Sequence, residues 1–159
     1  MQKRTKPKQT ALPPLERILI IGNGGRENSL AWALSKCNGV KETFVSPGNG
    51  GTESLKGCIR LSIDETESKQ LINFCLNNQI YLVVIGPEAP LAAGLADDLR
   101  NKGLIVFGPG AKGALLEASK QWAKQLMKEG NIPTANHWAV TNKEEALQIA
   151  MQIDQPLVV

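Results

Sequence analysis

The chain is poor in the residues that build metal sites, disulfides and membrane spans. Its 159 residues include one histidine, His137, and three cysteines, Cys37, Cys58 and Cys75. The cysteine number is odd and no two have the spacing of metal ligands, which predicts free, partly buried thiols and no zinc site. No stretch approaches the roughly 20 apolar residues that a membrane span requires, which argues against a membrane role.

The first ten residues contain no acid. Lys3, Arg4, Lys6 and Lys8 lie there, and without them the other 149 residues carry a net charge of −1 instead of +3. A nearly neutral folded part lacks the charge of a nucleic-acid-binding protein. The segment has neither the apolar core of a secretory signal nor the composition of a transit peptide, so residues 1–16 are predicted to be a disordered leader.

Aliphatic runs alternate with helical patterns along most of the chain. Residues 17–22 and 80–85 are the clearest runs, and each is followed by glycine or ends in it. Continuous aliphatic runs are typical of strands buried on both faces, and their alternation with helices indicates an α/β fold with a Rossmann-like open parallel sheet. The other expected elements are strands near 43–45, 59–63 and 104–107, and helices near 27–37, 64–78 and 90–102.

The pattern changes after Gly110, so we expect a domain boundary within residues 110–120. The first domain, residues 17–115, would be the Rossmann-like one. Residues 116–159 would be the truncated start of a second domain. Its expected elements are one or two helices over 111–130, a strand over 138–140 and a helix over 142–153.

Four glycine-rich turns follow strands and should gather at the carboxyl edge of the sheet, where open parallel sheets bind ligands. The first turn, residues 22–27, resembles a dinucleotide-binding turn, but Glu27 stands where that fingerprint has its third glycine. The second strand ends in Ser46-Pro47 and not in a ribose-binding acid. Three roles remain open for this turn: it could bind a phosphate at the helix N-terminus, it could bind NAD, or it could only pack the helix on the strand.

The second and third turns offer different chemistry. Residues 47–52 can form an anion-binding nest of backbone N–H groups with the Thr52 hydroxyl as a further donor, or can be a flexible loop. Residues 86–90 hold Glu88 between Pro87 and Pro90, which present its carboxylate to an amine or a ribose hydroxyl. The alternative for Glu88 is an acid that interacts with a helix dipole. The fourth turn is residues 108–110.

Taken together, these segments resemble one family, glycinamide ribonucleotide synthetase, also called phosphoribosylamine–glycine ligase. The resemblance runs from about residue 17 to the end of the chain and is carried by six motifs in the family's order and spacing. They are IIGNGGRE at 20–27, PGNGGT at 47–52, VIGPEAPL at 84–91, FGP at 107–109, EASK at 117–120 and IPTA at 132–135.

The resemblance implies a cytoplasmic ATP-grasp ligase, in which residues 17–115 are the pre-ATP-grasp domain and residues 116–159 are the truncated start of the ATP-grasp domain. Such an enzyme uses ATP to phosphorylate the carboxylate of glycine, and the amine of 5-phosphoribosylamine then attacks to give glycinamide ribonucleotide. It implies ATP and Mg²⁺ or Mn²⁺ as cofactors, small-molecule substrates, and neither nucleic acid nor membrane as partner. It implies a nucleotide-binding Lys120, and no catalytic or metal-ligating residue in this chain. The implied substrate-binding residues are Gly24, Gly25, Arg26, Glu27, Pro47, Gly48, Asn49, Gly51, Thr52, Gly86, Pro87 and Glu88.

Two departures from the family are visible. Asn28 stands where the family usually has histidine, and an asparagine cannot titrate near neutral pH. The family's chain also continues beyond Val159 into an ATP loop and metal-binding carboxylates, so the chain alone is expected to be inactive and to bind neither ATP nor metal. The alternatives are a stand-alone Rossmann-like module that binds a phosphorylated sugar and an NAD-dependent oxidoreductase domain.

Overall fold

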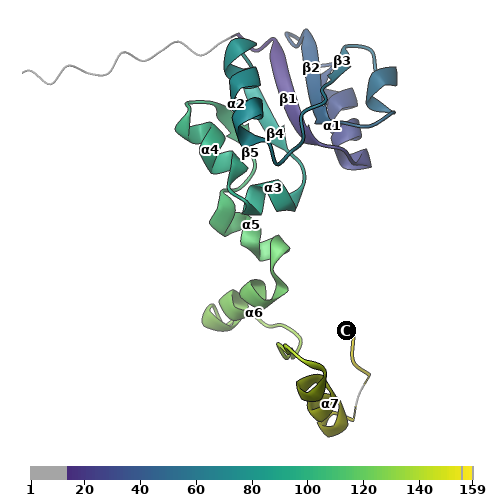
Figure 1. Cartoon of the computed structure of the whole chain (residues 1–159), viewed down its shortest axis with the longest axis vertical. Helices are drawn as coiled ribbons and strands as arrows, with labels where there is room; N and C mark the ends of the chain where they lie inside the picture. The colour runs from purple at the N-terminus through teal and green to yellow at the C-terminus, as the bar shows by residue number, and fades with distance from the viewer. Residues whose placement is uncertain (1–13, 155, 159) are drawn as a thin grey trace, which may run out of the picture. The chain divides into compact units, whose positions relative to one another are not determined.

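A computed structural model describes residues 14–154 and 156–158, and the chain separates into two compact units, residues 1–114 and 115–159. In the first unit, five parallel strands form one sheet in the order β3-β2-β1-β4-β5 (Figure 1). The expected α/β fold with an open parallel sheet is confirmed. The strands are β1 (Arg17–Gly22), β2 (Glu42–Pro47), β3 (Cys58–Arg60), β4 (Leu82–Ile85) and β5 (Ile105–Phe107).

Helices connect the strands. The first unit contains α1 (Gly25–Leu34), the 3-10 helix η1 (Thr52–Ser54), α2 (Ser68–Asn77), α3 (Glu88–Ala92) and α4 (Leu95–Asn101). Helix α5 (Ala111–Ala118) spans the division between the units, and α6 (Lys120–Glu129) and α7 (Lys143–Gln152) belong to the second unit.

Strand β1 is buried on both faces, as its continuous aliphatic run predicts. Alternate side chains of a strand point to opposite faces of the sheet. Leu19 and Ile21 belong to the core cluster that contains residues of α2 and α4, whereas Ile18 and Ile20 pack in a second cluster with Ala31 of α1. The sheet is thus a central layer between α1 on one face and α2 and α4 on the other.

Three expected elements differ in the structure. The helix expected over residues 90–102 is two helices, because Gly94 adopts the left-handed conformation (φ +95°) between α3 and α4. The helix expected from Asp64 begins instead at Ser68, since the Asp64 carboxylate accepts from the N–H and hydroxyl of Thr66 in a preceding turn. The strand expected over residues 138–140 is wrong, because these residues pair with no strand in the described chain.

The expectations of partly buried free thiols and of a leader over residues 1–16 are only partly met. No cysteine of the described residues is in a disulfide; Cys75 is buried and Cys58 half-buried, but Cys37 is exposed. Residue Glu16, assigned to the leader, already belongs to the fold, because its carbonyl accepts hydrogen bonds from the N–H groups of Lys41 and Glu42. Residues 1–13 of the predicted leader lie outside the described residues. None of the helices described in the structure has the length and apolarity needed to cross a membrane.

Two buried threonines differ in whether the hydroxyl group has a hydrogen-bond partner, which allows the effect of that partner on stability to be measured. Thr43 on β2 and Thr52 on η1 are both fully buried, but Thr43 Oγ1 has no partner among the described residues, whereas Thr52 Oγ1 accepts the Asn49 N–H at 3.2 Å. Thr43→Val should therefore raise the free energy of unfolding by about 1 kcal/mol, since it removes an unpaired buried hydroxyl without changing shape. Thr52→Val should lower it by about 1–2 kcal/mol. Urea unfolding measures both, and equal losses in the two variants would contradict the prediction.

Candidate functional site

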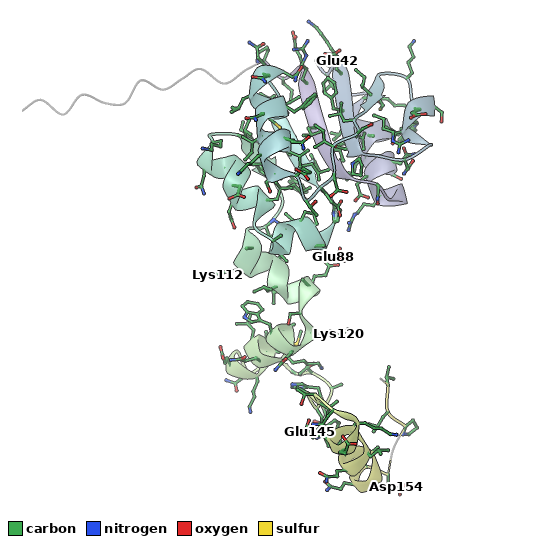
Figure 2. The ribbon with its side chains drawn as sticks, in the orientation of Figure 1. Glu42, Glu88, Lys112, Lys120, Glu145 and Asp154 are labelled. Atoms are coloured by element: carbon green, nitrogen blue, oxygen red, sulfur yellow. The ribbon has the colours of Figure 1, made fainter. Side chains whose placement is uncertain are left out.

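The loops after β1 and β4 begin at the topological switch point of the sheet. Strands β1 and β4 are neighbours, and the chain leaves β1 toward β2 but leaves β4 toward β5, on the opposite side. Open α/β sheets bind ligands beyond the carboxyl ends of the strands at such a point. The Gly86 N–H donates to the Ile21 carbonyl at 3.0 Å, which joins the two strand ends. Figure 2 shows Glu88, in the loop after β4, at the end of the sheet opposite to Glu42, the first residue of β2.

The carboxylate of Glu27 lies between the first and third loops. Only 3% of Glu27 is exposed, its Oε2 accepts the Gly24 N–H at 2.8 Å, and its Oε1 accepts Arg26 Nε at 2.7 Å. Burial of the carboxyl group acts to raise its pKa, but the hydrogen bonds from Arg26 and Gly24 outweigh burial, so the pKa of Glu27 is lowered. Glu27 is therefore a buried, ionised group whose charge is satisfied by its own loop.

Three glycines surround this carboxylate, and each is required by it. A Cβ atom at Gly86 would lie 1.8 Å from Glu27 Oε1, one at Gly22 would lie 2.7 Å from Glu27 Cγ, and one at Gly24 would lie 2.8 Å from Glu27 Oε2. Gly22 also has a φ of +129°, which side chains rarely tolerate. The first-loop glycines therefore make room for the Glu27 side chain. This packing explains why a glutamate stands where the dinucleotide fingerprint has its third glycine, and it argues against the NAD alternative.

The first and second loops are joined by hydrogen bonds. The Gly48 N–H donates to the Gly22 carbonyl at 3.1 Å, and Asn49 Nδ2 donates to the Asn23 carbonyl at 2.8 Å. The Thr52 hydroxyl donates to Oδ1 of Asn28 at 3.4 Å, so the residue that departs from the family pattern connects the two loops. These contacts argue against an independent, flexible loop at residues 47–52.

The N–H groups of the second loop are used within the protein. Those of Gly48, Asn49, Gly51 and Thr52 donate to a carbonyl or side-chain oxygen of the first two loops. The anion-binding nest expected there is therefore not formed by these groups. Backbone N–H groups also gather at the start of α1, where the Glu27 carboxylate already accepts those of Gly24 and of Glu27 itself.

Two acids lie near Glu27. Glu88 is the first residue of α3 and is exposed, which places its carboxylate at the carboxyl edge as the sequence predicts. Glu65, between β3 and α2, is a residue that the sequence reasoning missed. Its Oε2 atom is buried and has no hydrogen-bond partner among the described residues. Burial raises the pKa of Glu65, and the negative charges of Asp64, Glu27 and Glu88 raise it further. The one available signal was its position just after the third strand, which ends at the same edge.

The fourth turn and Lys120 belong to other elements of the chain. The turn at residues 108–110 is held from α4, because Arg100 Nη2 donates to the carbonyls of Val106 and Gly108 and Asp97 accepts the Ala111 N–H. Lys120 is the exposed first residue of α6 in the second unit, directly after the N-cap residue Ser119. Within the described part of the chain, no group of three or more His, Cys, Asp or Glu side chains could hold a metal ion.

A family model described as "Phosphoribosylglycinamide synthetase, N domain" matches residues 16–117, which include the first three loops. The chain belongs to this family. The chain is 41% identical over 143 residues to a phosphoribosylamine–glycine ligase of Clostridium acetobutylicum, covering 90% of this chain and 34% of the relative. It is 45% identical over the same length to the human trifunctional purine biosynthetic protein adenosine-3, of which it covers 14%. The chain therefore spans about a third or less of the length of these relatives.

Solved structures with a similar fold are more distant in sequence. The "glycinamide-RNase-transformylase T" of Mycobacterium tuberculosis has a TM-score of 0.65 at 18% identity, over 89% of this chain and 40% of that one. The biotin carboxylase domain of Hydrogenobacter thermophilus 2-oxoglutarate carboxylase has a TM-score of 0.63 at 18% identity, over 90% of this chain and 34% of that one. At this identity the two structures support the fold alone.

A pair of glycine variants tests the packing around Glu27. Gly86→Ala should lower the free energy of unfolding by about 2–3 kcal/mol, because its Cβ would overlap Glu27 Oε1. Gly25→Ala is the matched control, because a Cβ there meets nothing within 4 Å, and its effect should stay within about 0.5 kcal/mol. Urea unfolding compares the two. Equal stability of the two variants would mean that Glu27 does not fill the space beside Gly86.

Proposed function

We propose that this chain forms the phosphoribosylamine-binding part of an ATP-dependent ligase that joins glycine to 5-phosphoribosylamine in purine biosynthesis. The observation that carries the proposal is that the family's first three motifs meet at the switch point of the sheet, joined by Glu27 and by hydrogen bonds. Relatives that align with 90% of the chain and bear the name phosphoribosylamine–glycine ligase support a ligase over a stand-alone sugar-binding module.

The loop residues divide into two groups in this proposal. Glu27, Asn49 and Thr52 have their polar atoms bonded within the loops, so they hold the loops in place. The first turn of α1, with Gly25 and Arg26, offers positive electrostatic potential to the ligand's phosphate. The remaining implied residues, Gly24, Pro47, Gly48, Gly51, Gly86 and Pro87, shape the backbone that the ligand approaches.

Glu88 would orient the substrate amine. Amide formation requires the amine nitrogen to direct its lone pair at the activated glycine carboxyl carbon, after which the phosphate leaves. A carboxylate that accepts a hydrogen bond from one N–H of the amine restricts its rotation and favours that orientation. Glu88 is exposed at the carboxyl edge and could do this without any rearrangement of the core.

In this proposal the nucleotide is held by the part of the enzyme to which the second unit belongs. Lys120 would meet an ATP phosphate as a point charge. Ser119 caps α6 by accepting the Trp122 N–H at 3.2 Å, which fixes the first turn from which Lys120 extends. ATP would supply the phosphoryl group that activates glycine, and a divalent cation would require carboxylates other than those described.

A ligand titration tests the proposed function. We expect glycinamide ribonucleotide, a stable compound with the phosphoribosyl group, to shift the backbone amide NMR signals of residues 22–27, 48–52, 86 and 88 in the isotope-labelled chain. NAD should shift them less at equal concentration, because Glu27 and its glycines leave no dinucleotide turn. NMR detects millimolar binding, so a weak half-site is still measurable. Stronger shifts with NAD, or none with glycinamide ribonucleotide, would refute the proposal.

Removing the charge of Glu88 should weaken ligand binding without changing stability. Glu88→Gln keeps the shape of the side chain, and the loss of a hydrogen bond to a charged group predicts about tenfold weaker binding of glycinamide ribonucleotide. Asp98→Asn, an exposed acid of α4, is the control and should bind like the unaltered chain. If Glu88→Gln lowers the melting temperature and leaves affinity unchanged, Glu88 serves only the start of α3.

A further inference from the structure

We propose that Glu65 is a further substrate-contacting residue of this site, and that its carboxyl group accepts a hydrogen bond from an amine or hydroxyl of a phosphoribosyl ligand. The inference rests on the function proposed above. It adds a residue that lies outside the motifs of the resemblance and extends the ligand contacts to a third connection of the sheet, the one between β3 and α2.

The segment that carries Glu65 is fastened to the carboxyl edge of the sheet. Ser46, near the end of β2, donates its hydroxyl to the Ile63 carbonyl at 2.6 Å, and the Leu61 N–H donates to the Val45 carbonyl at 2.9 Å. Pro47, which opens the second loop, follows Ser46 directly. Glu65 is thus attached to the same strand end from which the second loop of the site begins.

Glu65 differs from the acids beside it in the chain. The Asp64 carboxylate accepts two hydrogen bonds from Thr66, and Glu67 accepts one from Gln70. Glu65 Oε2, by contrast, is buried and has no partner among the described residues. A buried acceptor without a donor costs stability, and nearly all such groups in folded proteins are bonded to protein, water or ligand. A ligand N–H or O–H group would satisfy it.

The charges around Glu65 determine which end of a ligand it can meet. The acids that act on it are Asp64 of its own segment, Glu27 of α1 and Glu88 of α3. The Glu27 charge is paired with Arg26, so the carboxylates that repel a phosphate and attract an amine or hydroxyl are those of Asp64, Glu65 and Glu88. The ligand's phosphate would therefore lie toward the first turn of α1, and its amine and ribose hydroxyls toward Glu65 and Glu88.

The binding test compares two neighbouring acids in the chain. In the NMR titration with glycinamide ribonucleotide, Glu65→Gln should weaken binding by about threefold to tenfold, because a charge-assisted hydrogen bond is replaced by a neutral one. Glu67→Gln is the matched control on the same segment and should bind like the unaltered chain. Equal affinity for the Glu65→Gln variant and the unaltered chain would overturn the role of Glu65 and leave the proposed function standing. No binding by the unaltered chain would overturn both.

Stability separates a ligand-binding role from a structural one. Because the pKa of Glu65 is raised on folding from its ordinary value of 4.5, the folded chain loses stability as the pH rises above that value and Glu65 ionises. Glu65→Gln should therefore raise the melting temperature at about pH 7 and have no such effect at about pH 3, where the group is protonated in both states. A lower melting temperature at pH 7 would show that Glu65 supports the fold, and would overturn the proposal.

A measurement on the unaltered chain covers the case in which a variant does not fold. The carboxyl ¹³C signal of Glu65 reports its protonation, and a hydrogen-bond donor from the ligand stabilises the ionised form. Saturating glycinamide ribonucleotide should therefore lower the pKa read from this signal. An unchanged Glu65 titration in the saturated chain would overturn the proposal.

Discussion

The packing of the Glu27 carboxylate against Gly22, Gly24 and Gly86 is the constraint on which the candidate site depends. These glycines follow β1 and β4, the two strands at the switch point, so one buried side chain determines how closely two loops approach. The carboxylate stays ionised because Gly24 and Arg26 donate to it. Burying a charged group costs little stability when hydrogen bonds within its own loop satisfy the charge. The Glu27 side chain can then act as a spacer of fixed size between the loops.

From this spacer the site acquires two chemically different sides. We assign the phosphate to the first turn of α1, which contains Gly25, Arg26 and Glu27, whereas Glu65 and Glu88 supply carboxylates. A ligand with a phosphate at one end and an amine and hydroxyls at the other matches this arrangement in charge. The second loop holds the site together, because the side chains of Asn49 and Thr52 form hydrogen bonds with the first loop, with Asn28 of α1 and within the second loop itself.

The sequence predicts the parts of this architecture that depend on local pattern, and misses the parts that depend on distant residues. The strands β1 and β4 were predictable because strands buried on both faces are continuously aliphatic. The role of Glu27 was not, because the sequence alone presents it as a missing glycine, and only its contact with Gly86 shows what it does. Glu65 belongs to no motif, and the charges of Glu27 and Glu88 that act on it come from segments far from it in the chain. The apolar residues 138–140 resemble a strand, but a strand requires a partner, which the described chain does not provide.

The most direct test is a crystal structure of the chain with glycinamide ribonucleotide bound. We expect the phosphate within hydrogen-bonding distance of the N–H groups in the first turn of α1. The amino end and the ribose hydroxyls should lie within hydrogen-bonding distance of Glu65 and Glu88, and the Glu27 carboxylate should remain bonded to Gly24 and Arg26. A ligand bound away from the switch point, or a Glu27 side chain that leaves its glycines to contact the ligand, would contradict this view of the site.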